Sequence, residues 1–234
     1  GFPALELTVG SSTFGSDYAG FRSQIAAASA RSIFFAEGST SNVLVRQEQG
    51  RRGLSLNGLG QGSHGELPPR HVFESLLVGF VPLAHVEDPR NALIVGLGAG
   101  STLDYLLSRG VPRVTVVELE PEVVKASRVV FGDEKNPVDD ERVTLRVEDA
   151  RHFLRVNLQQ GQEKFDLLTS MPAHPWVAGP IFTREFFELA RASLSERGVF
   201  STWFGDGGRP RAAVEALLAA FTHSFDHYII YRID

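Results

Sequence analysis

A glycine-rich turn and a later acidic residue have the types and spacing that bind a nucleoside. Gly96, Gly98 and Gly100 follow the apolar run ALIVGL and precede a segment with helical spacing. Glycines at such a turn permit a tight bend and let a ligand approach backbone that no side chain shields. Glu118 lies twenty residues after Gly98, at the end of the next apolar run, where a carboxylate can accept hydrogen bonds from both hydroxyls of a ribose.

These residues also have purely structural interpretations. The glycine turn is compatible with a close packing point between a strand and a helix, and Glu118 with a solvated strand end. The context favours a nucleotide site, because a strand precedes the turn, a helix follows it, and an acid ends the next strand.

A third acidic element, Glu148-Asp149-Ala150-Arg151, ends the following apolar segment. A carboxylate there can accept a hydrogen bond from an adenine amino group. Asp149 also suits the N-cap of a helix that begins at Ala150, and the two roles are compatible. No second half typical of a dinucleotide site is present, so the third acid favours a mononucleoside such as an adenosyl sulfonium.

The elements that position these residues are strands alternating with helices. Six apolar segments separated by helical ones predict an α/β fold with a doubly wound, mostly parallel sheet. Because the carboxyl ends of parallel strands meet at one edge of a sheet, the glycine turn, Glu118 and Asp149 are expected together there. The six strands are expected at residues 92–97, 114–119, 142–149, 165–170, 197–204 and 226–233.

The N-terminal part has a different character. Residues 1–30 are rich in Gly, Ser and Ala and are expected to form a linker or arm. Residues 31–70 predict a small domain of antiparallel strands, with a turn at Gln49-Gly50 and a loop from Gly58 to Pro69. Residues 71–234 then form the predicted nucleoside-binding domain, opening with a helix over 71–85.

Composition narrows the classes of function. The net charge of −5 and the pI near 5.8 argue against a nucleic-acid partner. The absence of cysteine excludes disulfides and Cys-based zinc sites, and His64, His71 and His85 lack metal-ligand spacing with acids, so no metal is expected. The sequence contains no run of eighteen apolar residues, so no transmembrane helix is predicted within it.

The motif series as a whole resembles the spermidine synthase (polyamine aminopropyltransferase) family. The resemblance covers about Glu37 to Trp203 and is closest to bacterial homologues in which this domain follows a membrane-embedded segment. The segments that carry the resemblance are VPLAH, ALIVGLGAGSTL, VTVVELEPEVV, DERVTLRVEDAR, FDLL, HPWVAG and IFTREFFELARASLSERGVFSTW.

The resemblance implies a methyltransferase-like Rossmann fold that carries a small N-terminal β-hairpin domain. It implies decarboxylated S-adenosylmethionine as donor, an amine as acceptor, Glu118 on the ribose and Asp149 on the adenine. It also places Ala150 and Ser170 at the donor site. The protein would be cytoplasmic, or would lie at the cytoplasmic face of a membrane as part of a longer protein.

The chain departs from the family at its catalytic positions. Ala99 stands where the family has an Asp that holds the donor's amine, and Met171 and His174 stand at the family's carboxylate positions. His174 can act as a base near neutral pH, but the residue type and context slightly favour a loop imidazole that caps a turn. Trp176 is either a wall of the acceptor pocket or a packing anchor.

Three hypotheses therefore stand. The first is a spermidine synthase-like transferase that binds decarboxylated S-adenosylmethionine, S-adenosylmethionine or methylthioadenosine, with non-standard or weak aminopropyl transfer. The second is a catalytically degenerate nucleoside-binding or interaction domain of a larger membrane protein. The third is an S-adenosylmethionine-dependent methyltransferase, since Ala99 lacks the feature that separates the two donors.

The sheet edge predicts one further partner. Methyltransferase-like Rossmann folds usually close with a seventh, antiparallel strand, which this sequence does not include. The strand expected at 226–233 would then present Tyr228, Ile230 and Ile233 at an open edge. Such an edge pairs readily with another strand, so a homodimer or a covering N-terminal arm is expected.

Overall fold

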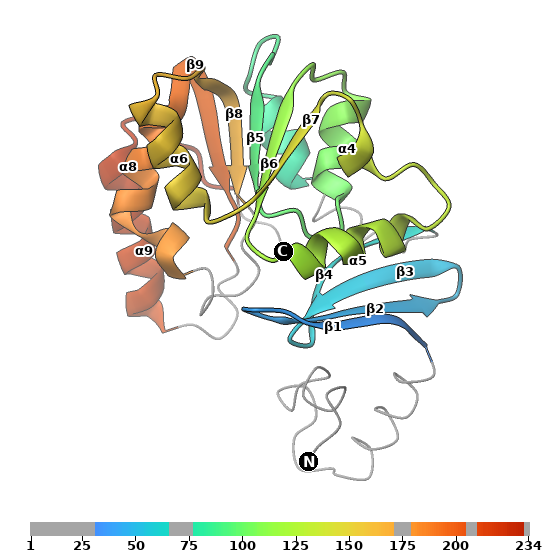
Figure 1. The fold of residues 1–234 in the computed structure, drawn as a ribbon. Coiled ribbons are helices and arrows are strands. Elements are labelled where there is room, and N and C mark those ends of the chain that lie inside the picture. Colours follow the sequence, from blue (N-terminus) through green and yellow to red (C-terminus); the bar gives the residue numbers. More distant parts are fainter. Residues whose placement is uncertain (1–30, 66–76, 171–178, 205–209, 232–234) are drawn as a thin grey trace.

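The strands form two sheets that meet at the carboxyl ends of the parallel one (Figure 1). The computed structural model describes residues 31–65, 77–170, 179–204 and 210–231. The smaller sheet is antiparallel, with the order β1-β2-β3-β4. Its strands are β1 (Ser32–Glu37), β2 (Asn42–Glu48), β3 (Arg51–Leu56) and β4 (Leu59–Gly65).

Two tight turns build this antiparallel sheet. The β2–β3 turn at Gln49-Gly50 was expected, and both residues have positive φ, at 48° and 76°. The β3–β4 turn at Asn57-Gly58 has the same geometry, with φ of 47° and 84°. Two-residue loops with positive φ at both positions match the twist of the strands they join, and Asn-Gly favours them. The predicted loop over 58–69 is therefore wrong for residues 59–65, which form β4.

The larger sheet is parallel and confirms the α/β prediction. Its order is β7-β6-β5-β8-β9, and every neighbouring pair is parallel. The central strand β5 is fully buried on both faces, as its uninterrupted apolar run predicts. The strands are β5 (Ala92–Val95), β6 (Val114–Glu118), β7 (Val143–Val147), β8 (Phe165–Ser170) and β9 (Leu194–Thr202).

Helices cover both faces of the parallel sheet (Figure 1). One face and the antiparallel sheet share a core with α4 and α5, and α5 contacts all four strands of the smaller sheet. The other face packs under α6 and α8 through Phe186 and Phe187, and α9 packs on α8. The helices are α4 (Ser101–Ser108), α5 (Pro121–Phe131), α6 (Ala150–Gln159), α8 (Arg184–Ser193) and α9 (Arg211–Ser224), with short 3-10 turns η2 (Pro137–Asp139) and η3 (Gly179–Phe182).

The sixth predicted strand is wrong. Residues 225–231 follow α9 without forming a strand, and residues 232–234 lie outside the described part. Aromatic packing replaces sheet pairing, since Phe225 stacks on Phe200 with ring centroids 5.3 Å apart. Tyr228 and Ile230 are exposed, as expected, although not on a strand edge. Whether a second copy covers them stays a prediction.

The ends of the expected elements were otherwise close to the observed ones. The helix expected at 71–85 is described over 77–83, while residues 66–76 and the arm at 1–30 lie outside the described residues. Within the described ranges, no helix has both the length and the apolar character needed to cross a bilayer.

Candidate nucleoside-binding site

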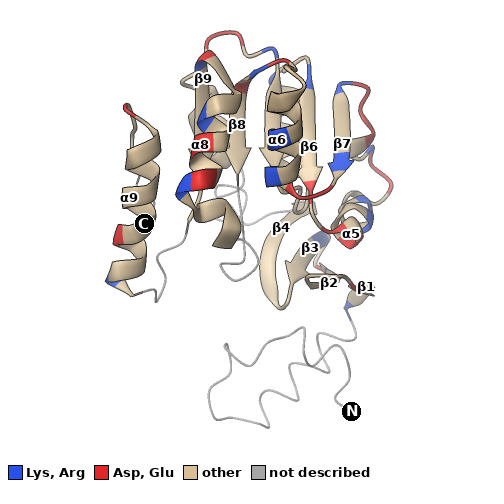
Figure 2. Ribbon diagram, turned by 60° about the vertical axis from the view of Figure 1, so that its left-hand side comes forward, with Lys and Arg blue, Asp and Glu red and all other residues tan. Residues whose placement is uncertain are grey.

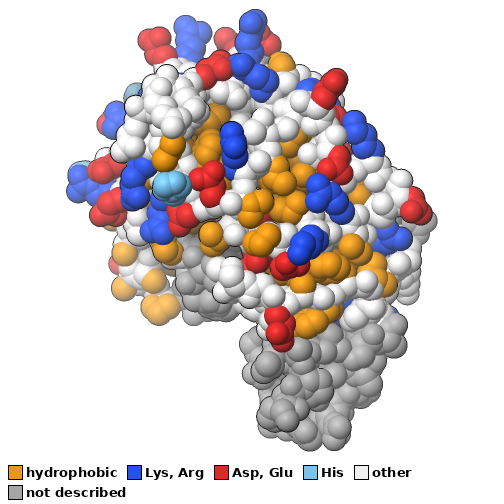
Figure 3. All heavy atoms as spheres, in the orientation of Figure 1, with side chains coloured by type: hydrophobic (Ala, Val, Ile, Leu, Met, Phe, Trp, Pro, Cys, Tyr) orange, Lys and Arg blue, Asp and Glu red, His pale blue; other side chains and the backbone are white. Residues whose placement is uncertain are grey.

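A cavity of about 330 Å³ lies where the two sheets meet. Its floor is formed by the carboxyl ends of the parallel strands, including Gly96, Gly98 and Glu118. Its opposite wall is formed by residues of the antiparallel sheet and its turns, namely Thr40, Ser41, Leu56 and Gln61. Figure 3 shows acidic and apolar side chains next to each other at the level where the two sheets meet. Gly96, Gly98, Glu118 and Asp149, which were predicted from the ends of three separate strands, therefore line one hollow.

The glycine turn is shaped for a close approach of backbone. Gly96, Gly98 and Gly100 all have positive φ, at 89°, 55° and 97°. A Cβ on Gly98 would lie 3.0 Å from the carbonyl oxygen of Gln61, so this position has little room for a side chain. Gly96 and Gly98 line the cavity, whereas Gly100 is the N-cap of α4. The turn therefore leaves backbone rather than side chains facing a ligand.

Two contacts hold the turn in place from opposite sides. The Ala99 amide donates to the carbonyl of Gln61, on β4, at 3.3 Å. The Ser127 hydroxyl, on α5, donates to the Ala99 carbonyl at 3.1 Å. Ala99 itself is 2% exposed and packs into the core, so it does not line the cavity. The antiparallel sheet thus contributes directly to the shape of the predicted cofactor loop.

Glu118 is a buried carboxylate, which rules out the solvated strand end. It is 7% exposed and lines the cavity. Its Oε2 accepts from the Leu97 amide at 2.7 Å, and its Oε1 accepts from the Glu120 amide at 2.9 Å. Burial raises the pKa of Glu118, and the hydrogen bonds from the Glu120 and Leu97 amides oppose that rise. These amides fix both oxygens in place beside the glycine turn.

Asp149 is confirmed as the N-cap of α6. Its Oδ1 accepts from the backbone amides of Arg151 at 2.7 Å and His152 at 3.2 Å. Its other oxygen forms an ion pair with the Arg151 guanidinium at 2.8 Å, and this hydrogen-bonded partner lowers the pKa of Asp149. Asp149, Ala150 and Arg151 also line the cavity. Capping and adenine recognition therefore remain compatible, and the second stays a prediction.

Replacing Asp149 with alanine should lower the free energy of unfolding by about 1 kcal/mol, the usual cost of losing an N-cap. Asp149→Asn is the matched variant, because its amide oxygen caps nearly as well while the charge beside Arg151 is lost. Urea denaturation of the three proteins measures the difference. An equal loss of unfolding free energy in both variants would show that the ion pair, not the cap, stabilises this end of α6.

The remaining predicted residues lie at or beyond the end of β8. Ser170 is its last residue and is fully buried, and its carbonyl accepts from the Trp203 amide at 3.1 Å. Ser170 does not line the cavity, although its neighbour Thr169 does. Met171, His174 and Trp176 lie outside the described residues, so their roles stay predictions.

Several cavity residues were missed by the sequence analysis. Thr40 and Ser41 come from the turn between β1 and β2, Gln61 from β4, and Glu120 from the start of α5. A second acid two residues after Glu118 was the available signal for Glu120.

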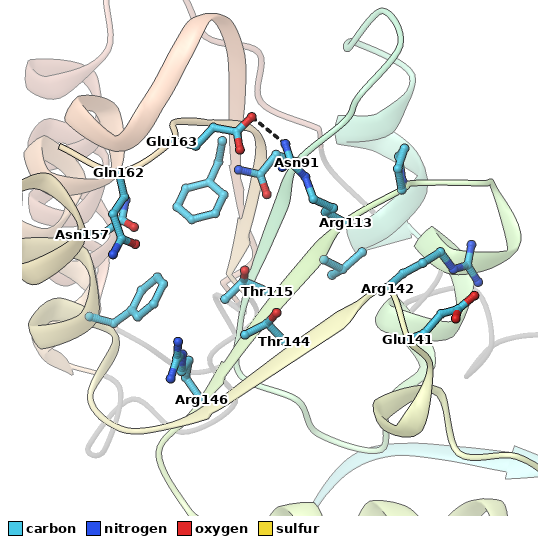
Figure 4. A pocket seen from close by; sticks show the side chains of 14 residues that line it. Asn91, Arg113, Thr115, Glu141, Arg142, Thr144, Arg146, Asn157, Gln162 and Glu163 are labelled. Carbon is cyan, nitrogen blue, oxygen red and sulfur yellow. Dashed lines mark hydrogen bonds and ion pairs between the residues drawn. The ribbon is translucent and has the colours of Figure 1, made fainter. Parts of the chain in front are cut away.

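A second hollow, of about 580 Å³, lies between α6 and the strands β6 and β7 (Figure 4). Arg113 there forms an ion pair with Glu163 at 2.5 Å. Arg142 binds Asp140, and these hydrogen bonds hold the pKa of Asp140 well below its usual range. None of the predicted site residues that the structure describes lines this hollow. The cavity between the two sheets is therefore the candidate site.

The described residues include no group of three or more His, Asp or Glu side chains placed to hold a metal ion. They do line a cavity of about 330 Å³ at the carboxyl ends of the parallel strands. The fold and the cavity together define a methyltransferase-like Rossmann domain with an added antiparallel sheet.

Residues 70–222 match the family model of the spermine/spermidine synthase domain, and the chain belongs to that family. Polyamine aminopropyltransferase of Archaeoglobus fulgidus is 30% identical over 162 residues, which are 69% of this chain and 57% of that protein. Polyamine aminopropyltransferase of Saccharolobus solfataricus is 27% identical, over 63% of this chain and 48% of that protein. The chain thus spans about half the length of these relatives.

Solved structures share the fold. Spermidine synthase in complex with the transition-state analogue AdoDATO matches with a TM-score of 0.73 at 20% identity, over 84% of this chain and 66% of that one. Spermidine synthase from Thermotoga maritima matches with a TM-score of 0.68 at 19% identity, over 83% of this chain and 64% of that one. At 19–20% sequence identity, the similarity to these structures establishes the fold alone.

Proposed function

We propose that the chain binds a cationic adenosyl sulfonium in the cavity and transfers an aminopropyl group from it to an amine. Decarboxylated S-adenosylmethionine is the proposed donor, and methylthioadenosine is the nucleoside product. The names of the similar polyamine aminopropyltransferases and spermidine synthases support this class of reaction. The acidic lining of the cavity is the observation that carries it.

Among the described residues, four carboxylates and one basic side chain line the cavity. That side chain, Arg151, is already paired with Asp149. Figure 2 shows acidic residues at the carboxyl ends of β6 and β7, facing the antiparallel sheet. The four carboxylates belong to Glu118, Glu120, Glu148 and Asp149.

This excess of negative charge selects among adenosyl donors. A sulfonium and an ammonium are attracted to it, whereas the carboxylate of S-adenosylmethionine is repelled. Partial burial strengthens both effects because the dielectric constant is lower there than in water. Decarboxylated S-adenosylmethionine carries both cations and lacks the carboxylate, so it fits the cavity best.

In the proposed reaction a deprotonated amine nitrogen attacks the carbon beside the sulfonium sulfur. The new C–N bond forms as the C–S bond breaks, the bonding electrons return to sulfur, and neutral methylthioadenosine leaves. The amine's proton passes to a base. Glu118 would hold the ribose and Asp149 the adenine, with Gly96 and Gly98 against the nucleoside. His174 is the proposed base, and Met171 and Trp176 would line the acceptor site.

The acceptor is proposed to be an amine other than putrescine, or putrescine used slowly. Carboxylates bind a diamine and remove its proton, and Met171 does neither. A methyltransferase is the second candidate, because Ala99 stands where the family has the Asp that holds the donor's amine, so this position does not separate the two donors.

A thermal-shift panel with methylthioadenosine, decarboxylated S-adenosylmethionine and S-adenosylmethionine tests the proposal. A ligand at 100 times its dissociation constant stabilises a protein by about 2.7 kcal/mol, which is readily detected. We expect the decarboxylated donor to stabilise more than S-adenosylmethionine does. Mass spectrometry with a series of amines then detects transfer. A preference for S-adenosylmethionine together with methylated products would favour the methyltransferase. Binding of a donor without any turnover would favour the catalytically degenerate domain.

A further inference from the structure

Glu120 joins the two sheets across the edge of the cavity. It is 3% exposed, although it carries a carboxylate. Its Oε2 accepts from the Thr40 amide at 2.8 Å, from the Thr40 hydroxyl at 3.0 Å and from the Ser39 hydroxyl at 3.2 Å. All three donors belong to the turn between β1 and β2. A charged acceptor strengthens each of these hydrogen bonds relative to a neutral one.

The turn is built to receive this carboxylate. Residues 38–41 connect β1 to β2, and the Gly38 amide donates to the Ser41 carbonyl at 2.9 Å. A Cβ on Gly38 would lie 2.4 Å from the Glu120 carboxyl carbon, so a larger residue would push the carboxylate away. Ser39 and Thr40 are otherwise exposed. The contact with Glu120 therefore determines where this exposed turn lies.

The same residue also contacts the predicted ribose acid. The Glu120 amide donates to Glu118 Oε1 at 2.9 Å. Its side chain thus holds the turn of the antiparallel sheet while its backbone holds Glu118. Thr40 and Ser41, on that turn, line the cavity together with Glu118. The wall and the floor of the cavity are connected through one residue.

We propose that Glu120 is a positioning residue that fixes the β1–β2 turn as the wall of the nucleoside cavity, and so sets the affinity for the adenosyl ligand. This inference rests on the proposed function for the identity of the ligand. Glu120 acts through Thr40 and Ser41. The Oε1 of Glu120 is buried and has no hydrogen-bond partner among the described residues.

Three variants separate this role from general stabilisation. Glu120→Ala removes the acceptor, Glu120→Gln keeps one acceptor oxygen without charge, and Gly38→Ala displaces the carboxylate from the other side. Glu122→Ala is the control, because Glu122 lies on the same helix but forms a surface ion pair with Lys125 at 2.6 Å. Methylthioadenosine affinity is measured by calorimetry at a temperature where every variant is folded, and hydrogen exchange follows the Thr40 amide.

Glu120→Ala should weaken methylthioadenosine binding roughly tenfold or more, the equivalent of about one hydrogen bond to a charged group. Exchange of the Thr40 amide should accelerate by a comparable factor, because its acceptor is gone. Glu120→Gln should recover most of both losses, Gly38→Ala should reproduce them, and Glu122→Ala should change neither.

Unchanged affinity in Glu120→Ala and Gly38→Ala would overturn the proposal, as would faster exchange spread over the whole antiparallel sheet rather than at the turn. If the unmodified protein does not bind methylthioadenosine, the proposed function fails. Exchange of the Thr40 amide in the ligand-free variants then still decides whether Glu120 fixes the turn.

Discussion

Replacing Met171 and His174 with aspartate should raise putrescine aminopropyl transfer by about 10²–10⁴-fold, the usual contribution of a positioned acid–base group. The unmodified chain should turn putrescine over slowly or not at all. A thioether beside a putrescine ammonium offers no Coulomb attraction, and removing the cation from water without a partner is costly. An aspartate supplies both the attraction and a site for the proton.

The rate is measured by mass spectrometry of spermidine formed from decarboxylated S-adenosylmethionine and putrescine. Met171→Asn with His174→Asn is the matched control, since it has similar volume and polarity without the charge. Donor affinity should be alike in all three proteins, because Glu118 and Asp149 are unchanged. Rapid turnover by the unmodified chain would contradict the prediction. It would mean that His174 works as a fully effective base without the introduced carboxylates, or that an acid elsewhere at the cavity mouth has taken this role.

The parallel sheet was predictable because its signals are local and strong. An uninterrupted apolar strand such as β5 has few other interpretations, and each helix that follows begins with a recognisable residue, such as Pro121 or Asp149. The positions of Glu118 and Asp149 then follow from topology, since parallel strands end at one edge.

The errors came from segments whose structure depends on distant partners. β4 contains three glycines and no alternating apolar pattern, and it forms because the Asn57-Gly58 turn directs it back along β3. The segment 225–231 has the composition of a strand, but Phe225 packs on β9 and α9 and Tyr231 contacts His85 instead. Composition alone does not provide a neighbouring strand.

The cavity was only half predicted for the same reason. The glycine turn, Glu118 and Asp149 all belong to one repeating strand–helix pattern. Thr40 reaches Glu120 across eighty residues of sequence, and Gln61 contacts the glycine turn from a different sheet. No local pattern indicates that a hairpin turn and a helix start will meet, so the wall of the cavity required the structure.

Glu118→Ala should weaken methylthioadenosine binding by about 1–3 kcal/mol, the range for losing hydrogen bonds to a charged acceptor. The variant also leaves the Leu97 and Glu120 amides without their acceptor, so the glycine turn loses a contact in the same step. Calorimetry measures the loss. Glu118→Gln is the matched variant, because it retains the size of the side chain and one acceptor oxygen. Unchanged affinity in Glu118→Ala would place the ribose elsewhere.

The pH dependence of binding distinguishes a direct contact from a structural one. Burial raises the pKa of Glu118 in the ligand-free protein, so this carboxyl takes up its proton at a higher pH in the folded chain than in the unfolded one. The stability that this group contributes is therefore present below its unfolded pKa and is lost as pH rises through the folded pKa. Ribose hydroxyls donate to the ionised carboxylate, and a bound nucleoside should lower the pKa of Glu118 again.

Methylthioadenosine affinity should consequently fall as pH is lowered through the raised pKa of Glu118, and binding near that pH should release a proton. Calorimetry in two buffers with different ionisation enthalpies counts the released protons. The release should disappear in Glu118→Gln, which has no proton to lose, while Asp149→Asn should retain it. A proton release that persists in Glu118→Gln would show that another carboxylate of the cavity, and not Glu118, receives the ribose.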